Sequence, residues 1–186
     1  MAFVGLYLAA CLLLVCAGAA KAARPGTSAR ALAEVRVVPG SPTVLRRTIR
    51  LLAAAEAALG VMALVFPRPL PATLVGASYA AFAAFVLFVR AKGGAMASCG
   101  CFGTPDTPAT RLHAMLNAVL AAASAGVAVS GTGGTMAGYL AHQPLDGVPL
   151  VGAGAACAWL AFHAVTTLGR LGEARRPAGP LPVRGR

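Results

Sequence analysis

The amino-acid sequence predicts an all-α fold, a polytopic bundle of about five transmembrane helices. Hydrophobic residues make up 58% of the 186 residues and charged residues only 11%, too little charge to cover a water-soluble domain of this size. The chain also contains five apolar stretches that can each cross a hydrocarbon core, which takes about 20 residues of helix. We therefore expect a membrane protein without a second, water-soluble domain.

The five predicted spans follow one another through short connections. The first has small residues after it, in AGAAKAA, as a signal peptide would, but no Lys or Arg before it, so we interpret it as a retained helix. Alanine and glycine are abundant within the spans, as in LLAAAEAALG, and small residues let membrane helices pack closely. The spans cover residues 3–20, 48–66, 72–88, 112–130 and 148–168.

Basic residues gather in alternate connections. Residues 21–50 carry a net charge of +6, residues 90–111 carry +2, and the tail from 169 carries +4. This alternation is the positive-inside pattern of membrane proteins. It predicts a multi-pass protein of the cell (inner or plasma) membrane, with the N-terminus outside and the C-terminus in the cytoplasm. The lipid bilayer, rather than a nucleic acid, is the expected partner of this charge.

The predicted spans divide the chain into four parts. The first four spans form a membrane domain, and a glycine-rich outer loop, one additional span and a basic, disordered tail follow it. The boundaries of these parts are 1–130, 131–147, 148–168 and 169–186.

Glu56 is the only acidic residue in any of the apolar stretches. A charge inside a membrane helix is costly and indicates a functional site, and Lys21 is the nearest candidate partner. At about 1.5 Å per residue, Glu56 lies roughly 12 Å inside its helix, and Asn117 lies at a similar depth. Lys21, His113 and His163 fall in the same half of the bilayer. These residues form either a buried polar site or a hydrogen-bonded structural core.

The segment SCGCFG contains two thiols, Cys99 and Cys101, which are separated by the single residue Gly100. As a redox pair they would use the backbone freedom of Gly100 to close a small, strained and readily reduced ring. Nearby Arg, Lys and His side chains would favour the thiolate. As a metal site, the two thiolates would combine with His113 or His163 to bind copper or zinc. As structural residues, the cysteines would fill space around a turn. The redox interpretation is favoured and the other two stay open.

The remaining cysteines, Cys11, Cys16 and Cys157, stand singly in apolar stretches and are expected to be packing residues. Of the three, Cys16 is the best candidate for a resolving thiol.

The sequence contains no glycine-rich phosphate loop, serine triad or pair of carboxylates. No cofactor is identified, and a quinone stays open.

Four segments follow one another within residues 1–130: CAGAAKAARP, AAAEAALG, CGCFG and RLHAMLNAVL. In this order they resemble the methylamine utilisation protein MauE family, which is grouped with DoxX-like membrane proteins. Members of that family are implicated in maturation of the disulfide-rich small subunit of methylamine dehydrogenase, and look like membrane partners of thioredoxin-like proteins. The resemblance implies thiol–disulfide exchange that supports maturation of an exported partner. The family core is commonly a four-helix unit, so the fifth span and the tail are additions.

The resemblance and the residue chemistry together assign Cys99 and Cys101 as the catalytic pair. The supporting residues are Lys21, Glu56, Gly100, Phe102, Gly103, His113 and Asn117. The charge pattern places the cysteines in the cytoplasm, whereas oxidation of an exported protein takes place outside. Two alternatives stay open, a non-enzymatic assembly or transport subunit and a copper- or zinc-handling protein.

Overall fold

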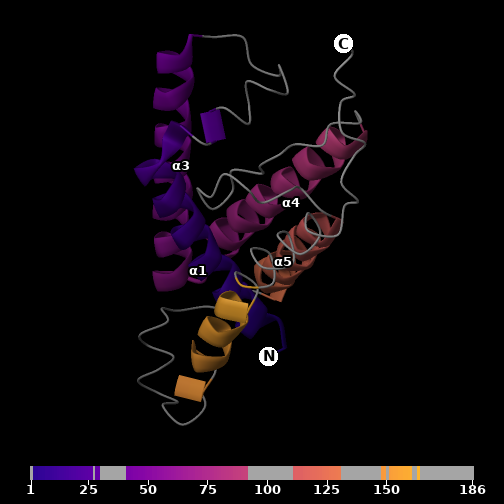
Figure 1. The fold of residues 1–186 in the computed structure, drawn as a ribbon. Helices are drawn as coiled ribbons and strands as arrows, with labels where there is room; N and C mark the ends of the chain where they lie inside the picture. Colours follow the sequence, from indigo (N-terminus) through magenta and orange to yellow (C-terminus); the bar gives the residue numbers. More distant parts are fainter. Residues whose placement is uncertain are drawn as a thin grey trace, which may run out of the picture.

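A computed structural model shows four long helices, each apolar enough to cross a membrane, and no strand among the residues it describes. A shorter apolar helix, Val151–Leu160, follows them. The predicted all-α bundle of about five helices is confirmed. The long helices are α1 (Ala2–Ala23), α3 (Pro42–Val65), α4 (Pro69–Ala91) and α5 (Arg111–Ser130) (Figure 1). The described residues are 2–26, 28–29, 41–91, 111–130, 148–149, 151–160 and 163.

Helix α3 begins at Pro42, six residues before the predicted start of its span. Ser41 caps the helix, because its side chain accepts a hydrogen bond from the Val44 N–H at 3.4 Å, and proline is well suited to the first helical position. The added turns carry Arg46 and Arg47, which hydropathy alone assigned to a connection. The start of α3 is therefore a charged extension of the span.

The helix Val151–Leu160 is the described part of the predicted fifth span. Apart from residues 148–149 and 163, the rest of that span lies outside the described residues. A complete fifth crossing therefore stays a prediction, as do the outer loop and the basic tail.

Helix α1 is the central helix of the bundle. It packs most extensively on α3, and also contacts α5 and α4, so it lies between α3 and the α4–α5 pair (Figure 1). Tyr7, Cys11 and Leu14 are completely buried in the core. Apolar residues cover every side of α1, a pattern typical of a helix surrounded by other helices.

Two glycines bring the backbones of α1 and α3 into contact. A Cβ atom added to Gly18 would lie 2.6 Å from the Ala53 carbonyl oxygen and 2.8 Å from the Ala57 nitrogen. A Cβ atom on Gly60 would lie 2.9 Å from the Cys11 carbonyl oxygen. The end of α1 thus faces the middle of α3, and the end of α3 faces the middle of α1, so the two helices are antiparallel. The close packing expected from small residues is confirmed at this seam.

The seam between α4 and α5 is looser. A Cβ atom on Gly76 would lie 3.4 Å from both the Ala121 carbonyl oxygen and the Ser124 side chain, an ordinary van der Waals distance. These helices are also packed extensively. Side chains, rather than backbone, therefore fill most of this seam.

Two tyrosines tie α1 to its neighbours. Tyr79 of α4 donates a hydrogen bond to the Ala10 carbonyl oxygen at 2.7 Å, and Tyr7 donates one to the Ala63 carbonyl oxygen of α3 at 3.2 Å. A helical carbonyl has a second lone pair, so it can accept such a bond without losing its place in the helix. Both tyrosines therefore lie in the core and not at the membrane surface, whereas Trp159 is 63% exposed.

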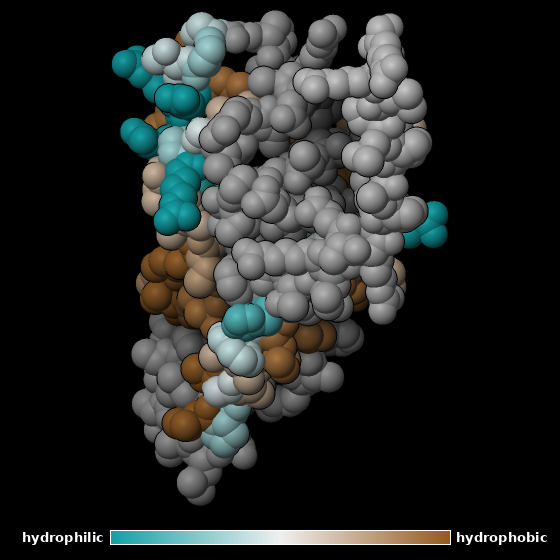
Figure 2. Space-filling view, viewed as in Figure 1, coloured by the Kyte–Doolittle hydropathy of each residue, from teal (hydrophilic) through white to brown (hydrophobic). Residues whose placement is uncertain are grey.

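Positive charge gathers at one end of the bundle, where α1 and α4 end and α3 and α5 begin. We call this the basic end. Figure 2 shows hydrophilic atoms over the start of α3 and hydrophobic atoms over its middle. Among the described residues, the opposite end carries only Arg68. The Lys and Arg residues of the basic end are Lys21, Arg24, Arg46, Arg47, Arg50, Arg90 and Arg111.

Candidate functional site

Lys21 and Glu56 form an ion pair inside the bundle, between Lys21 Nζ and Glu56 Oε2. Their side chains are only 12% and 19% exposed, respectively. Glu56 is also the only acidic residue in the described part of the chain. The pairing predicted from the sequence is therefore confirmed, and it joins the end of α1 to the middle of α3.

The tight α1–α3 seam explains why these two side chains meet. Gly18 lies three residues before Lys21, and its contact residue Ala53 lies three residues before Glu56. Residues three apart share a helix face, so the glycine contact sets both side chains at the same seam. Side chains in a helix lean toward its N-terminus, and in antiparallel helices they therefore lean toward each other. Glycine packing thus positions the charges.

The aromatic ring of Phe82 on α4 also faces the ammonium group. Lys21 Nζ lies 4.8 Å from the ring centroid, within the range of a cation–π interaction. Tyr79 packs edge-on against the same ring, with centroids 6.0 Å apart. Phe82 was not predicted from the sequence. Its helical spacing from Tyr79 and Val86 marks a buried face, but spacing cannot show that a cation lies on the other side.

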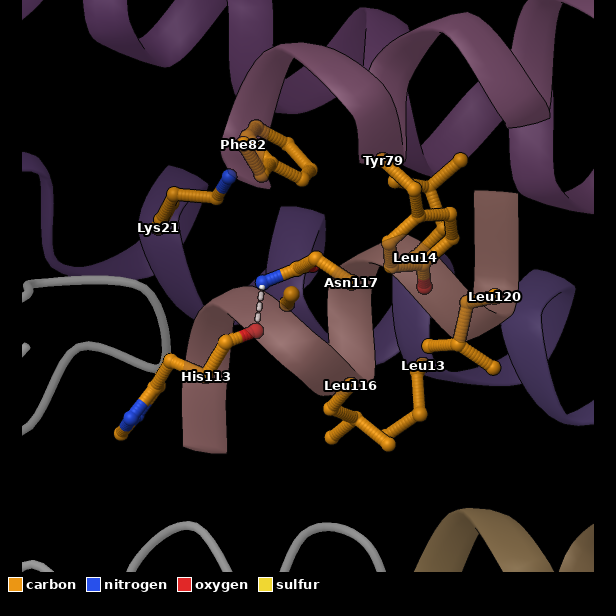
Figure 3. A pocket seen from close by; sticks show the side chains of 10 residues that line it. Leu13, Leu14, Lys21, Tyr79, Phe82, His113, Leu116, Asn117 and Leu120 are labelled. Atoms are coloured by element: carbon orange, nitrogen blue, oxygen red, sulfur yellow. Dashed lines mark hydrogen bonds between the residues drawn. The ribbon is translucent and has the colours of Figure 1, made fainter. Parts of the chain in front are cut away.

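A cavity of about 50 Å³ lies between α1, α4 and α5, next to the ammonium group. A space of this size holds a few water molecules. Figure 3 shows the side chains around it, which come from all three helices. Most of the wall is apolar, and the polar residues in it are Lys21, Tyr79, His113 and Asn117.

Asn117 and His113 occupy the first two turns of α5. The Asn117 side-chain amide donates a hydrogen bond to the His113 carbonyl oxygen at 2.7 Å. His113 is 4% exposed, and in Figure 3 its imidazole points away from Lys21 and Phe82. The predicted cluster of Lys21, Glu56, His113 and Asn117 is therefore present at one end of the bundle. Lys21, His113 and Asn117 line the same cavity.

His163 is not among the residues that line this cavity. Its ring packs against Trp159, with ring centroids 4.4 Å apart. In the same helix, a Cβ atom on Gly154 would lie 3.0 Å from Leu8 Cβ, so the helix packs beside the first half of α1.

The single cysteines differ in burial. Cys11 is completely buried in the core and packs as predicted. Cys16 and Cys157 are exposed on their helices, so the expectation that they pack inside the bundle is wrong. Among the described residues, no group of three or more His, Cys, Asp or Glu side chains comes close enough to hold a metal ion.

The predicted redox pair lies outside the described residues. Cys99 and Cys101, together with Gly100, Phe102 and Gly103, belong to the connection between the end of α4 and the start of α5. Both of those helix termini lie at the basic end. The connection therefore joins the bundle at the end where Lys21 and the cavity lie.

The family model of the methylamine utilisation protein MauE matches residues 1–130. No curated protein and no solved structure matches the chain. The matched region contains all four long helices, the ion pair and the connection with both cysteines, and it ends at the last residue of α5. The matched region is well over half of the chain, and its helices are those of a multi-pass membrane protein. The chain therefore belongs to the methylamine utilisation protein MauE family.

Proposed function

We propose that this protein supports thiol–disulfide exchange for an exported partner, with Cys99 and Cys101 as the redox pair. The observation that supports the proposal is the Lys21–Glu56 ion pair, held beside a cavity at the basic end of the bundle. Charged groups inside a membrane bundle are costly and typically mark a functional site. The connection that carries both cysteines begins and ends at the basic end, the end of the bundle where this site lies. The partner is a thioredoxin-like or other disulfide-containing protein, as the family's association with methylamine dehydrogenase maturation implies.

The proposed exchange has two steps. The thiolate of one cysteine attacks a disulfide of the partner, forms a mixed disulfide and releases one partner thiolate. The other cysteine then attacks its neighbour's sulfur, closes the Cys99–Cys101 disulfide and releases the second partner thiolate. Two electrons pass from the pair to the partner, and the dithiol of a second thiol–disulfide carrier restores the pair. The same steps in reverse oxidise a partner dithiol.

The polar cluster has a supporting role in this proposal. His113 and Asn117 lie in the first two turns of α5, directly after the connection, and they line the same cavity as Lys21. The ion pair holds α1 and α3 against this wall. We expect the cluster to hold the start of α5, and with it the cysteine-bearing connection, in a reactive position.

A redox titration of the cysteines tests the proposal. Purified protein is equilibrated in glutathione redox buffers, and its free thiols are then counted with a maleimide mass tag. In the wild type, two thiols should disappear together as the buffer becomes oxidising. Cys99→Ser or Cys101→Ser should instead leave one thiol as a mixed disulfide with glutathione, and should abolish function without preventing membrane insertion. Cys157→Ser, at an exposed cysteine elsewhere, is the matched control and should behave as the wild type.

Two results together would contradict the redox assignment. One is full activity of both serine variants, and the other is equal thiol reactivity of the wild type after oxidant and after reductant. The CGC segment would then be a structural turn. Release of bound copper or zinc from either variant, without a mixed disulfide, would favour the metal interpretation.

The proposed orientation places the basic end in the cytoplasm of the cell membrane. The clustering of Lys and Arg at that end supports it, because the positive-inside rule relates such charge to the cytoplasmic side. A reporter fused after Arg186 should be active only in the cytoplasm, and one inserted near Gly133 only outside. The reverse pattern at both positions would move the cysteines to the side where exported proteins are oxidised.

A second candidate function is a non-enzymatic assembly or transport subunit. The ion pair joins α1 to α3. A pair with a purely structural role would also join these helices, so this contact favours the second candidate. Glu56→Gln separates the two, since Gln keeps the shape and a hydrogen bond but loses the charge. A loss of thiol exchange in a variant that inserts normally favours the redox proposal. Full activity would leave the carboxylate a structural role.

A further inference from the structure

The α4–α5 seam opens at the basic end into a groove of about 550 Å³. Small alanine side chains leave the space, and Leu87 and Met115 form its apolar walls. These two side chains are 55% and 65% exposed, so the groove lies on the outer surface of the described helices. In a membrane protein, such an apolar surface faces lipid chains.

Two arginines lie at one end of this groove. Arg90 is in the last turn of α4 and Arg111 is the first residue of α5, and both line the groove and are exposed. Their helix termini lie where the bundle meets the membrane surface, at the depth of lipid headgroups. Guanidinium groups bind phosphate through paired hydrogen bonds, so two of them form a suitable phosphate site.

The helix termini strengthen this attraction for an anion. The start of α5 carries a partial positive charge, and its first turn contains no acidic residue. The dipole disfavours a cation such as Arg111 at that position, and a bound anion would offset both charges. The groove therefore combines an apolar surface with a positively charged end.

The described surface of a second copy does not complement the charge of this groove. Glu56 is the only carboxylate in the described helices, and it is already paired inside the bundle. The described surface of another copy therefore offers no carboxylate to the two arginines. An anionic lipid supplies both the charge and the apolar chain.

We propose that this groove binds one anionic phospholipid, with its phosphate between Arg90 and Arg111 and an acyl chain along Leu87 and Met115. The net negative charge of the headgroup provides selectivity, because the choline cation of a zwitterionic lipid would lie beside the same arginines. This lipid site is independent of the redox proposal.

Fluorescence quenching at the groove tests the proposal. Trp159→Phe removes the only tryptophan of the chain, and Leu112→Trp places a new one next to Arg111 without changing a groove residue. The protein is reconstituted in phosphatidylcholine vesicles with an increasing share of dibrominated phosphatidylglycerol. Quenching should exceed that by dibrominated phosphatidylcholine at the same share. The preference should fall about fivefold for each arginine changed to Gln.

The matched control is the double variant Arg46→Gln/Arg47→Gln on α3. It removes the same charge from the basic end as Arg90→Gln/Arg111→Gln, but these residues line a separate pocket with Pro25, Gly26 and Thr43. The control pair should lower the preference less than about twofold, because its charges lie away from the groove and are screened by salt. An equal loss in both double variants would overturn the proposal in favour of diffuse attraction to the membrane surface.

A further variant tests the apolar part of the groove. Ala118→Phe fills the space and keeps both arginines, and Ala118 is exposed, so the bundle should still fold. Quenching by the anionic lipid should fall in this variant. Unchanged quenching, or displacement of the lipid by inorganic phosphate, would show a simple anion site and overturn the proposal. No preference for the anionic lipid in the unmodified groove would overturn it as well.

Discussion

The α1–α3 seam and the α4–α5 seam are both antiparallel pairs of apolar helices, but they hold charge differently. In the first seam, Gly18 and Gly60 bring backbones into contact, and a charged pair lies inside. In the second, Gly76 allows only ordinary van der Waals contact, and the charges lie exposed at the end of the seam. Close backbone contact therefore positions a partly buried ion pair, whereas looser packing leaves a groove that opens toward the lipid.

The largest effect should follow from breaking the ion pair. Glu56→Ala leaves Lys21 without its partner, and we expect the free energy of unfolding to fall by about 3 kcal/mol. This is the low end of the range for such pairs, because a lysine near a helix end can extend toward the membrane surface. Unfolding with dodecyl sulfate in mixed micelles measures the change.

Replacing both members of the pair sharpens this test. Lys21→Met together with Glu56→Leu removes both charges and keeps similar volumes, so most of the stability should return. Arg68→Gln removes a cation from the opposite end and is the matched control. If the double variant is less stable than Glu56→Ala, the lost stability does not come from an uncompensated lysine.

The next largest effect should come from the glycines of the tight seam. A Cβ atom on Gly18 meets two backbone atoms of α3 within 3 Å, so Gly18→Ala forces the helices apart. We expect a loss of about 2 kcal/mol from overpacking, despite the higher helix propensity of alanine. Lys21 and Glu56 should also separate, so Gly18→Ala and Glu56→Ala should not be additive in a double-mutant cycle. Additive losses would show that the seam does not position the pair.

Sequence reasoning predicted those parts of the molecule that depend on hydropathy and on rare residues. The four long helices follow from apolar length, and the pair follows because Glu56 is the only acid in any apolar stretch and Lys21 is its nearest candidate partner. Phe82 was not predicted, because helical spacing indicates a buried face but does not show that a cation lies against it. The place of His163 relative to the ion pair stays a prediction. The roles of Cys99 and Cys101 stay a prediction.

A smaller effect is expected from the tyrosines that cross the seams. Tyr79→Phe removes a buried hydrogen bond of 2.7 Å to the Ala10 carbonyl oxygen, and its loss should cost about 1 kcal/mol. Tyr7→Phe removes a longer bond, of 3.2 Å, to the Ala63 carbonyl oxygen and should cost less. Both can be measured by the same unfolding titration. A larger loss for Tyr7→Phe than for Tyr79→Phe would show that the hydrogen bond between α1 and α4 contributes less stability than the hydrogen bond between α1 and α3.

The smallest effect should come from the glycine of the loose seam. A Cβ atom on Gly76 would reach Ala121 and Ser124 at 3.4 Å, where no backbone has to move. The better helix propensity of alanine then offsets any crowding, and we expect Gly76→Ala to change the free energy of unfolding by less than about 0.5 kcal/mol. Gly152→Ala is the control for propensity alone, because a Cβ atom there meets nothing within 4 Å. If Gly76→Ala lowers stability as much as Gly18→Ala does, the two seams are equally tight. The contrast between a seam that positions charge and one that leaves a groove would then be wrong.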